Sequence, residues 1–241
     1  MSNYSVLKFK SLSSTNAYIK DNIDSLTDRT VIVAEVQTDG LGRNNHKWIS
    51  LDEKKSLTFS VLFKGLTAKE AILIPVKAAV SVLSALDEIF SDNAFIKWPN
   101  DIIIANNKLC GILCTSVSVG DKFNVICGIG LNILNRKEDF EKSNLPYATS
   151  VFMETGKCIE SNDILKRILT EFDKNKDFVN DYRKRCITLG KEVVVIKNEK
   201  KIIAEAVDIT DKCELVCETA DGKRFIVNSG EVSVRGLYGY V

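Results

Sequence analysis

The pattern of hydrophobic and polar positions changes near Leu189-Gly190. Before this point, apolar runs of strand length alternate with longer segments of helical spacing, and after it only short β-rich runs separated by turns remain. We therefore predict a large α+β domain over residues 1–188 and a small all-β domain over residues 189–241. The strands are expected at residues 1–10, 30–36, 57–63, 122–132, 192–196, 201–209, 214–218 and 224–228.

Two long segments have apolar residues at the spacing of a helix. The first, residues 67–90, begins with a Thr-x-x-Glu capping box, and a bend or a restart is expected at Pro75. The second, residues 162–185, is amphipathic. A shorter helix is expected to follow residues 13–16, whose hydroxyl and amide side chains are typical of a helix N-terminus. The same hydroxyls suit contacts to a polar ligand, so both interpretations stay open here.

The stretch over residues 95–113 contains more polar side chains than its apolar surroundings explain. It predicts strand, turn, strand, tight turn and strand, with Pro99 in the first turn and Asn106-Asn107 in the second. Polar groups inside a protein need partners, and where these partners are not other side chains they belong to a ligand. The polar residues of the stretch are Lys97, Trp98, Asn100, Asp101 and Lys108.

Two further segments contain glycines where a backbone could approach a ligand closely. The loop over residues 37–48 also carries Arg43, a side chain that can bind phosphate or carboxylate with two hydrogen bonds. It is not a P-loop, because no Gly-Lys-Ser/Thr follows at the required spacing. In the later strand, Gly128 and Gly130 fall on one face and leave it without side chains, and Asn132 ends the run. The third glycine of a dinucleotide fingerprint is missing, which argues against a Rossmann fold.

Composition narrows the class of function. The formal net charge is +1 and no basic block is present, so nothing in the composition indicates nucleic-acid or membrane binding. The seven scattered cysteines favour a reducing cytoplasm. The single histidine, His46, leaves little basis for a Ser-His-Asp or Cys-His mechanism. A polar loop over residues 136–149 is long enough to act as a lid.

The cations of these segments, with Asp101, suit a reaction that holds two anions together. Acyl adenylation brings a substrate carboxylate against the α-phosphate of ATP, and fixed cations overcome the repulsion between them. A nearby carboxylate is available for Mg²⁺. The residues selected on this basis are Arg43, Lys47, Lys97, Lys108, Asn100, Asn132 and Asp101.

The motifs described above, taken in their order along the chain, resemble the signature of biotin protein ligases. The most specific part is K-W-P-N-D, which is followed by K-L-C-G-I-L. The loop over residues 37–48 resembles the family's Q-x-x-G-R-G-R-x-G-R-x-W. The resemblance covers essentially the whole chain. The matching segments are residues 14–16, 37–48, 97–101, 108–113, 128–132 and 230–235.

The resemblance implies an ATP-dependent ligase that activates biotin with MgATP to biotinyl-5′-AMP. The enzyme would then transfer biotin to one lysine of a biotin carboxyl carrier domain of a biotin-dependent carboxylase. The implied fold is α+β: a mixed, mostly antiparallel sheet with flanking helices, similar to class II synthetases, and a C-terminal SH3-like β-barrel. Family members are monomers or homodimers. Repressor members add an N-terminal helix-turn-helix domain, but here the resemblance begins almost at Met1, so we predict no DNA binding.

The resemblance also implies roles for single residues. Lys108 would hold the biotin carboxylate and the phosphate and, with Arg43, would be catalytic. Asp101 would help to bind Mg²⁺ or orient the lysines. Biotin is expected to contact Ser14, Thr15, Asn16, Gln37, Gly40, Gly42, Lys108, Gly111, Gly128 and Gly130. The nucleotide is expected to contact Arg43, Lys47, Trp48, Lys97, Asn100, Asn132 and Arg235.

Three loop residues depart from the family pattern. Leu41 and His46 stand where arginine is usual, and Asn45 stands where glycine is usual. The loop therefore has less positive charge and less flexibility, and a weaker grip on the intermediate is expected. Two alternatives remain open: a lipoate or octanoate ligase or transferase of the same superfamily, and a protein that binds biotin or its adenylate without turnover.

Overall fold

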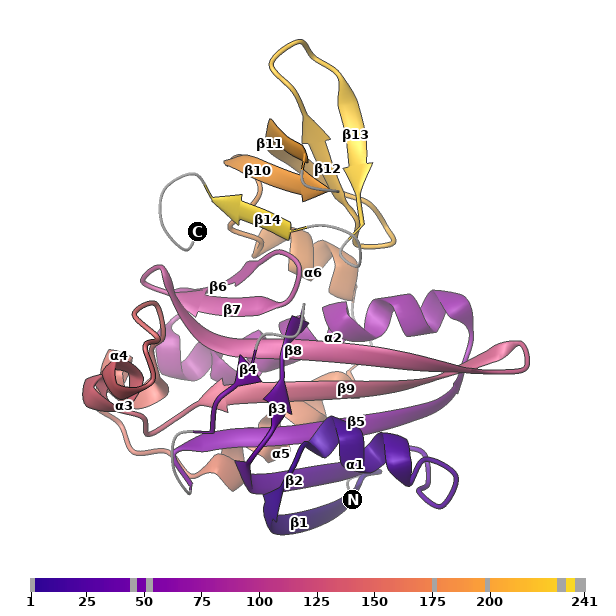
Figure 1. The fold of residues 1–241 in the computed structure, drawn as a ribbon, viewed down its shortest axis with the longest axis vertical. Helices are drawn as coiled ribbons and strands as arrows, with labels where there is room; N and C mark the ends of the chain where they lie inside the picture. Colours follow the sequence, from indigo (N-terminus) through magenta and orange to yellow (C-terminus); the bar gives the residue numbers. More distant parts are fainter. Residues whose placement is uncertain are drawn as a thin grey trace.

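The computed structural model describes residues 3–43, 47–50, 54–174, 177–197, 200–228 and 233–236. A seven-stranded sheet forms the centre of the larger part, in the order β1-β2-β5-β9-β8-β7-β6 (Figure 1). Only β1 and β2 pair in parallel, and every other pairing in this sheet is antiparallel, which confirms the predicted mixed, mostly antiparallel sheet. The strands are β1 (Ser5–Leu12), β2 (Thr30–Gln37), β5 (Ser56–Leu66), β6 (Ala94–Lys97), β7 (Asp101–Ile104), β8 (Asn107–Val119) and β9 (Lys122–Asn132).

Helices cover both faces of this sheet. The short α1 (Thr15–Asp21) packs on one face, where Ile19 lies in a small buried cluster with Ile32 on β2 and Leu62 on β5. The long α2 (Ala68–Phe90) covers the other face together with two further helices (Figure 1). The predicted capping box at the start of α2 is confirmed. The two helices beside α2 are α5 (Ser161–Phe172) and α6 (Phe178–Lys184).

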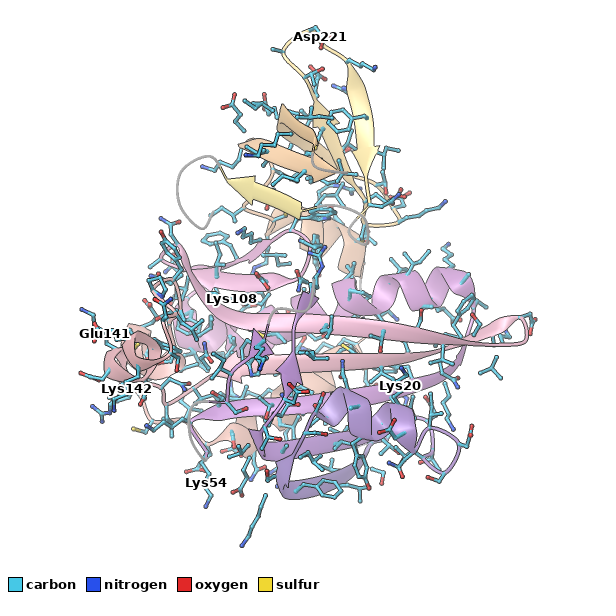
Figure 2. All side chains as sticks on the ribbon, in the orientation of Figure 1. Lys20, Lys54, Lys108, Glu141, Lys142 and Asp221 are labelled. Atoms are coloured by element: carbon cyan, nitrogen blue, oxygen red, sulfur yellow. The ribbon has the colours of Figure 1, made fainter. Side chains whose placement is uncertain are left out.

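A second sheet contains five antiparallel strands in the order β13-β12-β11-β10-β14. Its turn at Asp221-Gly222 was predicted, and Gly222 has the positive φ (81°) that such a turn requires. Asp221 lies at the tip of this sheet farthest from the central one (Figure 2). The strands are β10 (Glu192–Lys197), β11 (Lys200–Ile209), β12 (Leu215–Glu218), β13 (Arg224–Val227) and β14 (Ser233–Gly236).

The two sheets are joined through Trp98 and Pro99, which follow β6. The indole Nε1 of Trp98 donates to the carbonyl oxygen of Cys213 in the turn before β12 (3.0 Å), and the Trp98 backbone N–H donates to Thr188 Oγ1 (2.9 Å). The hydroxyl of Tyr182 on α6 donates to the carbonyl oxygen of Pro99 (2.8 Å). Residues from the C-terminal part of the chain therefore position this segment.

Several boundaries differ from the sequence prediction. Pro75 does not restart α2, because the buried neighbours Ile74 and Val76 hold the helix against the sheet. The single helix predicted over residues 162–185 is two helices, the second capped by Asp177, whose side chain accepts from Asn180 N.

Other differences concern turns and loops. The two-residue turn before β8 is Ala105-Asn106, one residue earlier than predicted, since these two residues have positive φ. The predicted loop at 136–149 contains a short helix, α3 (Lys137–Lys142), and a further helix, α4 (Val151–Thr155), follows it. No described helix is long and apolar enough to cross a membrane.

Candidate active site

A cavity of about 720 Å³ lies against the central sheet. Its walls come from the N-terminus of α1, the hairpin of β3 (Gly40–Leu41) and β4 (Lys47–Trp48), the β6–β7 turn and strands β8 and β9. Segments that are far apart in sequence thus meet, as the resemblance predicted. The predicted site residues that line the cavity are Ser14, Thr15, Asn16, Gln37, Gly42, Arg43, Lys47, Trp48, Lys97, Asn100, Asp101, Lys108, Gly111, Gly128 and Gly130.

Three predicted site residues are not among the described residues that line the cavity. Gly40 lies beside it, where a Cβ would be only 2.6 Å from the Trp48 carbonyl oxygen, so glycine permits the close β3–β4 pairing. Asn132 is buried and donates through Nδ2 to the carbonyl oxygen of Thr149 (3.0 Å). The backbone of Arg235 lies in β14, and its side chain is outside the described part. Their ligand contacts stay predictions, and residues 44–46 and 230–232 also lie outside the described residues.

A β-bulge at the start of β8 aims Lys108 at the cavity. The register between β7 and β8 shifts after Ile102, which pairs with Cys110, whereas the next residue, Ile103, pairs with Lys108. Leu109 and Cys110 are both buried in the core shared with α2, although they are consecutive. Without the extra residue, strand alternation would turn Lys108 to the same side as Cys110 and bury it.

The ammonium of Lys108 is held next to Asp101. Its Nζ lies 2.7 Å from Asp101 Oδ1, and the two side chains are 30% and 15% exposed. The backbone of Lys108 is fixed as well, because its N–H donates to the Tyr147 carbonyl oxygen (2.7 Å) and its carbonyl oxygen accepts from Thr149 N (2.9 Å). Figure 2 labels Lys108 at this position on the central sheet. The cation is therefore preorganised at one end of the cavity.

Arg43 lines the same part of the cavity, next to Asn100 and close enough to interact with Asp101. One guanidinium nitrogen donates to Asn100 Oδ1 (3.3 Å), and Asn100 Nδ2 donates to the carbonyl oxygen of Ile112 on β8 (2.6 Å). Burial lowers the pKa of Arg43, and the nearby charge of Asp101 opposes that shift. Because the ordinary pKa of arginine is so high, the side chain stays charged. It places a second fixed cation near Lys108.

Uncharged polar side chains line the other end of the cavity, farther along β8 and β9 at Leu113 and Gly128, whereas Lys108 lies next to Gly111. Ser14 caps α1 by accepting from Ala17 N (3.4 Å). The oxygen of the Gln37 side chain accepts from the Thr15 backbone N–H (2.7 Å) and from the Thr15 hydroxyl (3.0 Å). Asn16 Nδ2 donates to the carbonyl oxygen of Leu113 on β8 (3.2 Å). Of the hydroxyls and amides singled out from the sequence, Ser14 therefore serves as the helix cap, and all four side chains face the cavity.

The glycines of β8 and β9 make room for side chains of this chain. A Cβ at Gly130 would lie 2.3 Å from Trp48 Cε2, and one at Gly128 would lie 2.5 Å from Asn16 Oδ1. A Cβ at Gly111 would be 3.1 Å from Lys108 Cε. The glycine face was expected to be open for a ligand, but Trp48 and Asn16 occupy much of it. The buried indole Nε1 of Trp48 has no acceptor among the described residues, so a ligand atom could accept from it.

Several residues around the cavity carry no ligand-binding signal in the sequence. Ser60 lies behind Thr15 and Asn16, and the only signal for it was a hydroxyl at every second position of β5, at Ser56, Thr58 and Ser60. No periodicity marks the remaining residues, which come from loops or from the apolar positions of strands. The lining residues that were not predicted as candidates are Leu41, Ile49, Phe59, Pro99, Ile112, Leu113, Ile129, Leu145 and Tyr147.

Comparison with known families agrees with this geometry. The profile described as "Biotin/lipoate A/B protein ligase family" matches residues 8–132, which is more than half of the chain. The chain belongs to this family. The profile "Biotin protein ligase C terminal domain" matches residues 188–235. This second match places the chain among the biotin protein ligases and supports the SH3-like assignment of the second sheet.

Solved and curated relatives point the same way. A biotin protein ligase from Aquifex aeolicus in complex with biotin and ATP superposes with a TM-score of 0.78 at 29% identity, covering 96% of this chain and 99% of that one. A bifunctional ligase/repressor BirA from Bacillus subtilis is 27% identical over 83% of this chain and 65% of its own length. A biotin–[acetyl-CoA-carboxylase] ligase from Mycobacterium tuberculosis is 28% identical over 85% of this chain and 79% of its own length. The chain thus spans just under two thirds of the first of these curated relatives.

Proposed function

We propose that the protein is an ATP-dependent biotin protein ligase. The observation that carries the proposal is the chemical difference between the two ends of one cavity. One end holds uncharged hydrogen-bonding groups from α1 and β2, and the other holds Arg43 and Lys108 beside Asp101. A molecule with a polar ring at one end and a carboxylate at the other fits this arrangement. Biotin has this form, and ATP supplies the phosphate that the cations attract.

In the first step, a biotin carboxylate oxygen attacks the α-phosphorus of ATP. A bond forms between that oxygen and the phosphorus, the bond to the bridging oxygen breaks, and pyrophosphate leaves with the electron pair. Lys108 and Arg43 reduce the repulsion between the carboxylate and the phosphate and stabilise the charge that develops on the phosphoryl oxygens. Because Asp101 already holds Lys108 in place, little reorganisation is needed during the reaction.

In the second step, the ε-amine of an acceptor lysine attacks the carbonyl carbon of biotinyl-5′-AMP. An amide bond forms, AMP leaves, and the amine loses a proton. The acceptor that we propose is a biotin carboxyl carrier domain, which the name of the Mycobacterium tuberculosis relative supports. Seven free cysteines support a cytoplasmic location, and a monomer or a homodimer remains our expectation for the assembly.

Asp101 is the carboxylate that fits Mg²⁺ bound mainly by phosphates and water. Such an ion needs only one or two protein carboxylates. No group of three possible metal-ligating side chains occurs in the described ranges, so a cage made by the protein alone is not part of the proposal. When bound with ATP, the ion would neutralise phosphate charge. Orienting Lys108 is the second role proposed for Asp101, and the 2.7 Å contact supports it.

Biotin-dependent exchange of pyrophosphate into ATP tests this function. We expect exchange with biotin and much weaker exchange with lipoate or octanoate. Exchange that prefers lipoate or octanoate would assign the protein to the other branch of its family. Tight binding of biotin without any exchange would identify a binding protein that does not turn over.

A further inference from the structure

The hydroxyl of Ser60 contacts two consecutive residues at the N-terminus of α1. Its Oγ lies 2.6 Å from Thr15 Oγ1 and 2.6 Å from Asn16 Oδ1. Ser60 is fully buried in the middle of β5 and does not line the cavity. A hydroxyl has a single proton, which here is shared between two acceptors. The side chain therefore acts on the cavity only through Thr15 and Asn16.

The two residues that Ser60 contacts are bonded in turn to two other strands. Thr15 donates to Gln37 Oε1 on β2, through both its backbone N–H and its hydroxyl. Asn16 donates through Nδ2 to the carbonyl oxygen of Leu113 on β8. Ser60 thus lies at the centre of a network that connects β2, β5, β8 and α1. Buried networks of this kind are stable only when every member is satisfied.

Gly128 completes the arrangement from the neighbouring strand. It pairs directly with Ser60 across β5 and β9. A Cβ at this position would lie 2.5 Å from Asn16 Oδ1 and 3.0 Å from both Asn16 Cγ and Nδ2. Such contacts are too short for any residue with a side chain unless Asn16 moves. The Asn16 amide group therefore packs against both Ser60 and the bare backbone of its cross-strand partner Gly128.

The network sets which atoms of the polar end are donors and which are acceptors. The amide oxygens of Asn16 and Gln37 face hydroxyl or N–H donors within the protein, so neither amide can turn over without losing these bonds. The hydroxyl of Ser14 accepts from Ala17 N, and no acceptor for its own proton occurs among the described residues. A ring that carries a carbonyl group next to N–H groups, as in a cyclic urea, matches a wall with donors and acceptors side by side. A ring without such groups would leave the donors and acceptors of this wall without hydrogen-bond partners.

We propose that Ser60 is a specificity-determining positioning residue for the ring of the acid substrate. By donating to Thr15 and Asn16 it keeps the polar end of the cavity in the single orientation that suits a ureido ring. This inference rests on the proposed biotin ligase function. It adds a residue outside the cavity to the groups that select the acid, and it assigns Gly128 to the same task.

The test is the Ser60→Ala variant, compared with Thr58→Val as a matched control. Thr58 lies two residues earlier on β5, is equally buried, and donates to the carbonyl oxygen of Ala34 (2.6 Å) outside the network. In pyrophosphate exchange, we expect Ser60→Ala to raise the KM for biotin about 10-fold, because Thr15 Oγ1 and Asn16 Oδ1 lose their donor. The KM for ATP should change less than about 2-fold. The rate of the weak exchange with lipoate should also change less than about 2-fold, because the lipoate ring lacks hydrogen-bonding groups. Thr58→Val should leave both KM values within about 2-fold of wild type.

An unchanged KM for biotin in Ser60→Ala would overturn the inference. An equal rise of the KM values for biotin and ATP, or the same shift in Thr58→Val, would also overturn it, because these results indicate a general structural effect. If Ser60→Ala does not fold, Ser60→Cys keeps the volume while weakening the donor, and the same results decide. Failure of the proposed function would be distinct, since the wild-type protein would then show no exchange that depends on biotin.

Discussion

Replacing Gly130 by alanine should displace the indole of Trp48 from the central sheet. The added Cβ would lie 2.3, 2.5 and 2.9 Å from Trp48 Cε2, Cζ2 and Cδ2, distances at which the ring must move rather than adjust. Overpacking of this kind costs about 2 kcal/mol. When this cost destabilises the complex with biotin, the KM for biotin rises roughly 30-fold. The strand itself should tolerate alanine, because glycine is the weaker residue in a strand interior.

Gly111 provides the matched comparison for this prediction. It pairs with Gly130 across β8 and β9, but a Cβ there would be 3.1 to 3.3 Å from its nearest neighbours, Lys108 and Trp48. Gly111→Ala should therefore raise the KM for biotin only about 3-fold, which corresponds to less than about 1 kcal/mol.

The assay for both glycine variants is pyrophosphate exchange combined with tryptophan fluorescence. Only two tryptophans are present, and Trp98 is 2% exposed, so a red shift of the emission in Gly130→Ala would report Trp48 entering water. The reasoning would be refuted if Gly130→Ala left the KM for biotin and the emission unchanged. It would also be refuted if Gly111→Ala raised the KM for biotin as much as Gly130→Ala.

Two further predictions concern the contact between the sheets and the start of α2. Trp98→Phe removes the donor to the partly buried Cys213 carbonyl oxygen and should lower the free energy of unfolding by about 2 kcal/mol in urea titrations. A loss under about 0.5 kcal/mol would contradict this role. The Thr67 backbone N–H and hydroxyl donate to the Glu70 carboxylate and lower the pKa of Glu70 below its usual 4.5. The ionised carboxylate therefore stabilises the folded protein above pH 4.5, and this stabilisation is lost as the pH falls through the pKa of Glu70 in the folded protein. Glu70→Gln should lower stability at pH 7 by about 0.5 kcal/mol, since the carboxylate is exposed, and make the acid-side loss shallower. A parallel pH profile in the variant would show that Glu70 does not contribute to it.

Local patterns in the sequence predicted most of the architecture. The apolar runs predicted most strands of both sheets but not β14, and the capping box at Thr67 predicted the start of α2. The split between α5 and α6 was missed, because apolar residues continue at helical spacing on both sides of it. The turn before β8 was misplaced by one residue, since Ala105 rather than Asn107 takes the positive φ. Such boundaries depend on caps and turns that several residue types can form.

The candidate site was predicted as a set of residues, but not as a geometry. Motif spacing brought Lys108 and Asp101 together correctly, yet only the bulge at the start of β8 determines that Lys108 faces the cavity. The contact between Trp98 and Cys213 joins residues 115 positions apart, which no local pattern encodes. Ser60 was missed because a serine in a buried strand has no ligand-binding signature until its neighbours in space are known.

The most direct test of the proposed mechanism is transfer of biotin to a carrier domain by the Lys108→Ala variant. The wild-type protein, with biotin and MgATP, should add one biotinyl group to a single carrier lysine, detected by intact-mass spectrometry. Lys20→Ala is the matched control, because Lys20 is exposed at the end of α1, away from Lys108 (Figure 2). We expect Lys20→Ala to transfer biotin as the wild type does and Lys108→Ala to transfer almost none. Transfer at the wild-type rate by Lys108→Ala, or no transfer by the wild type, would contradict the account.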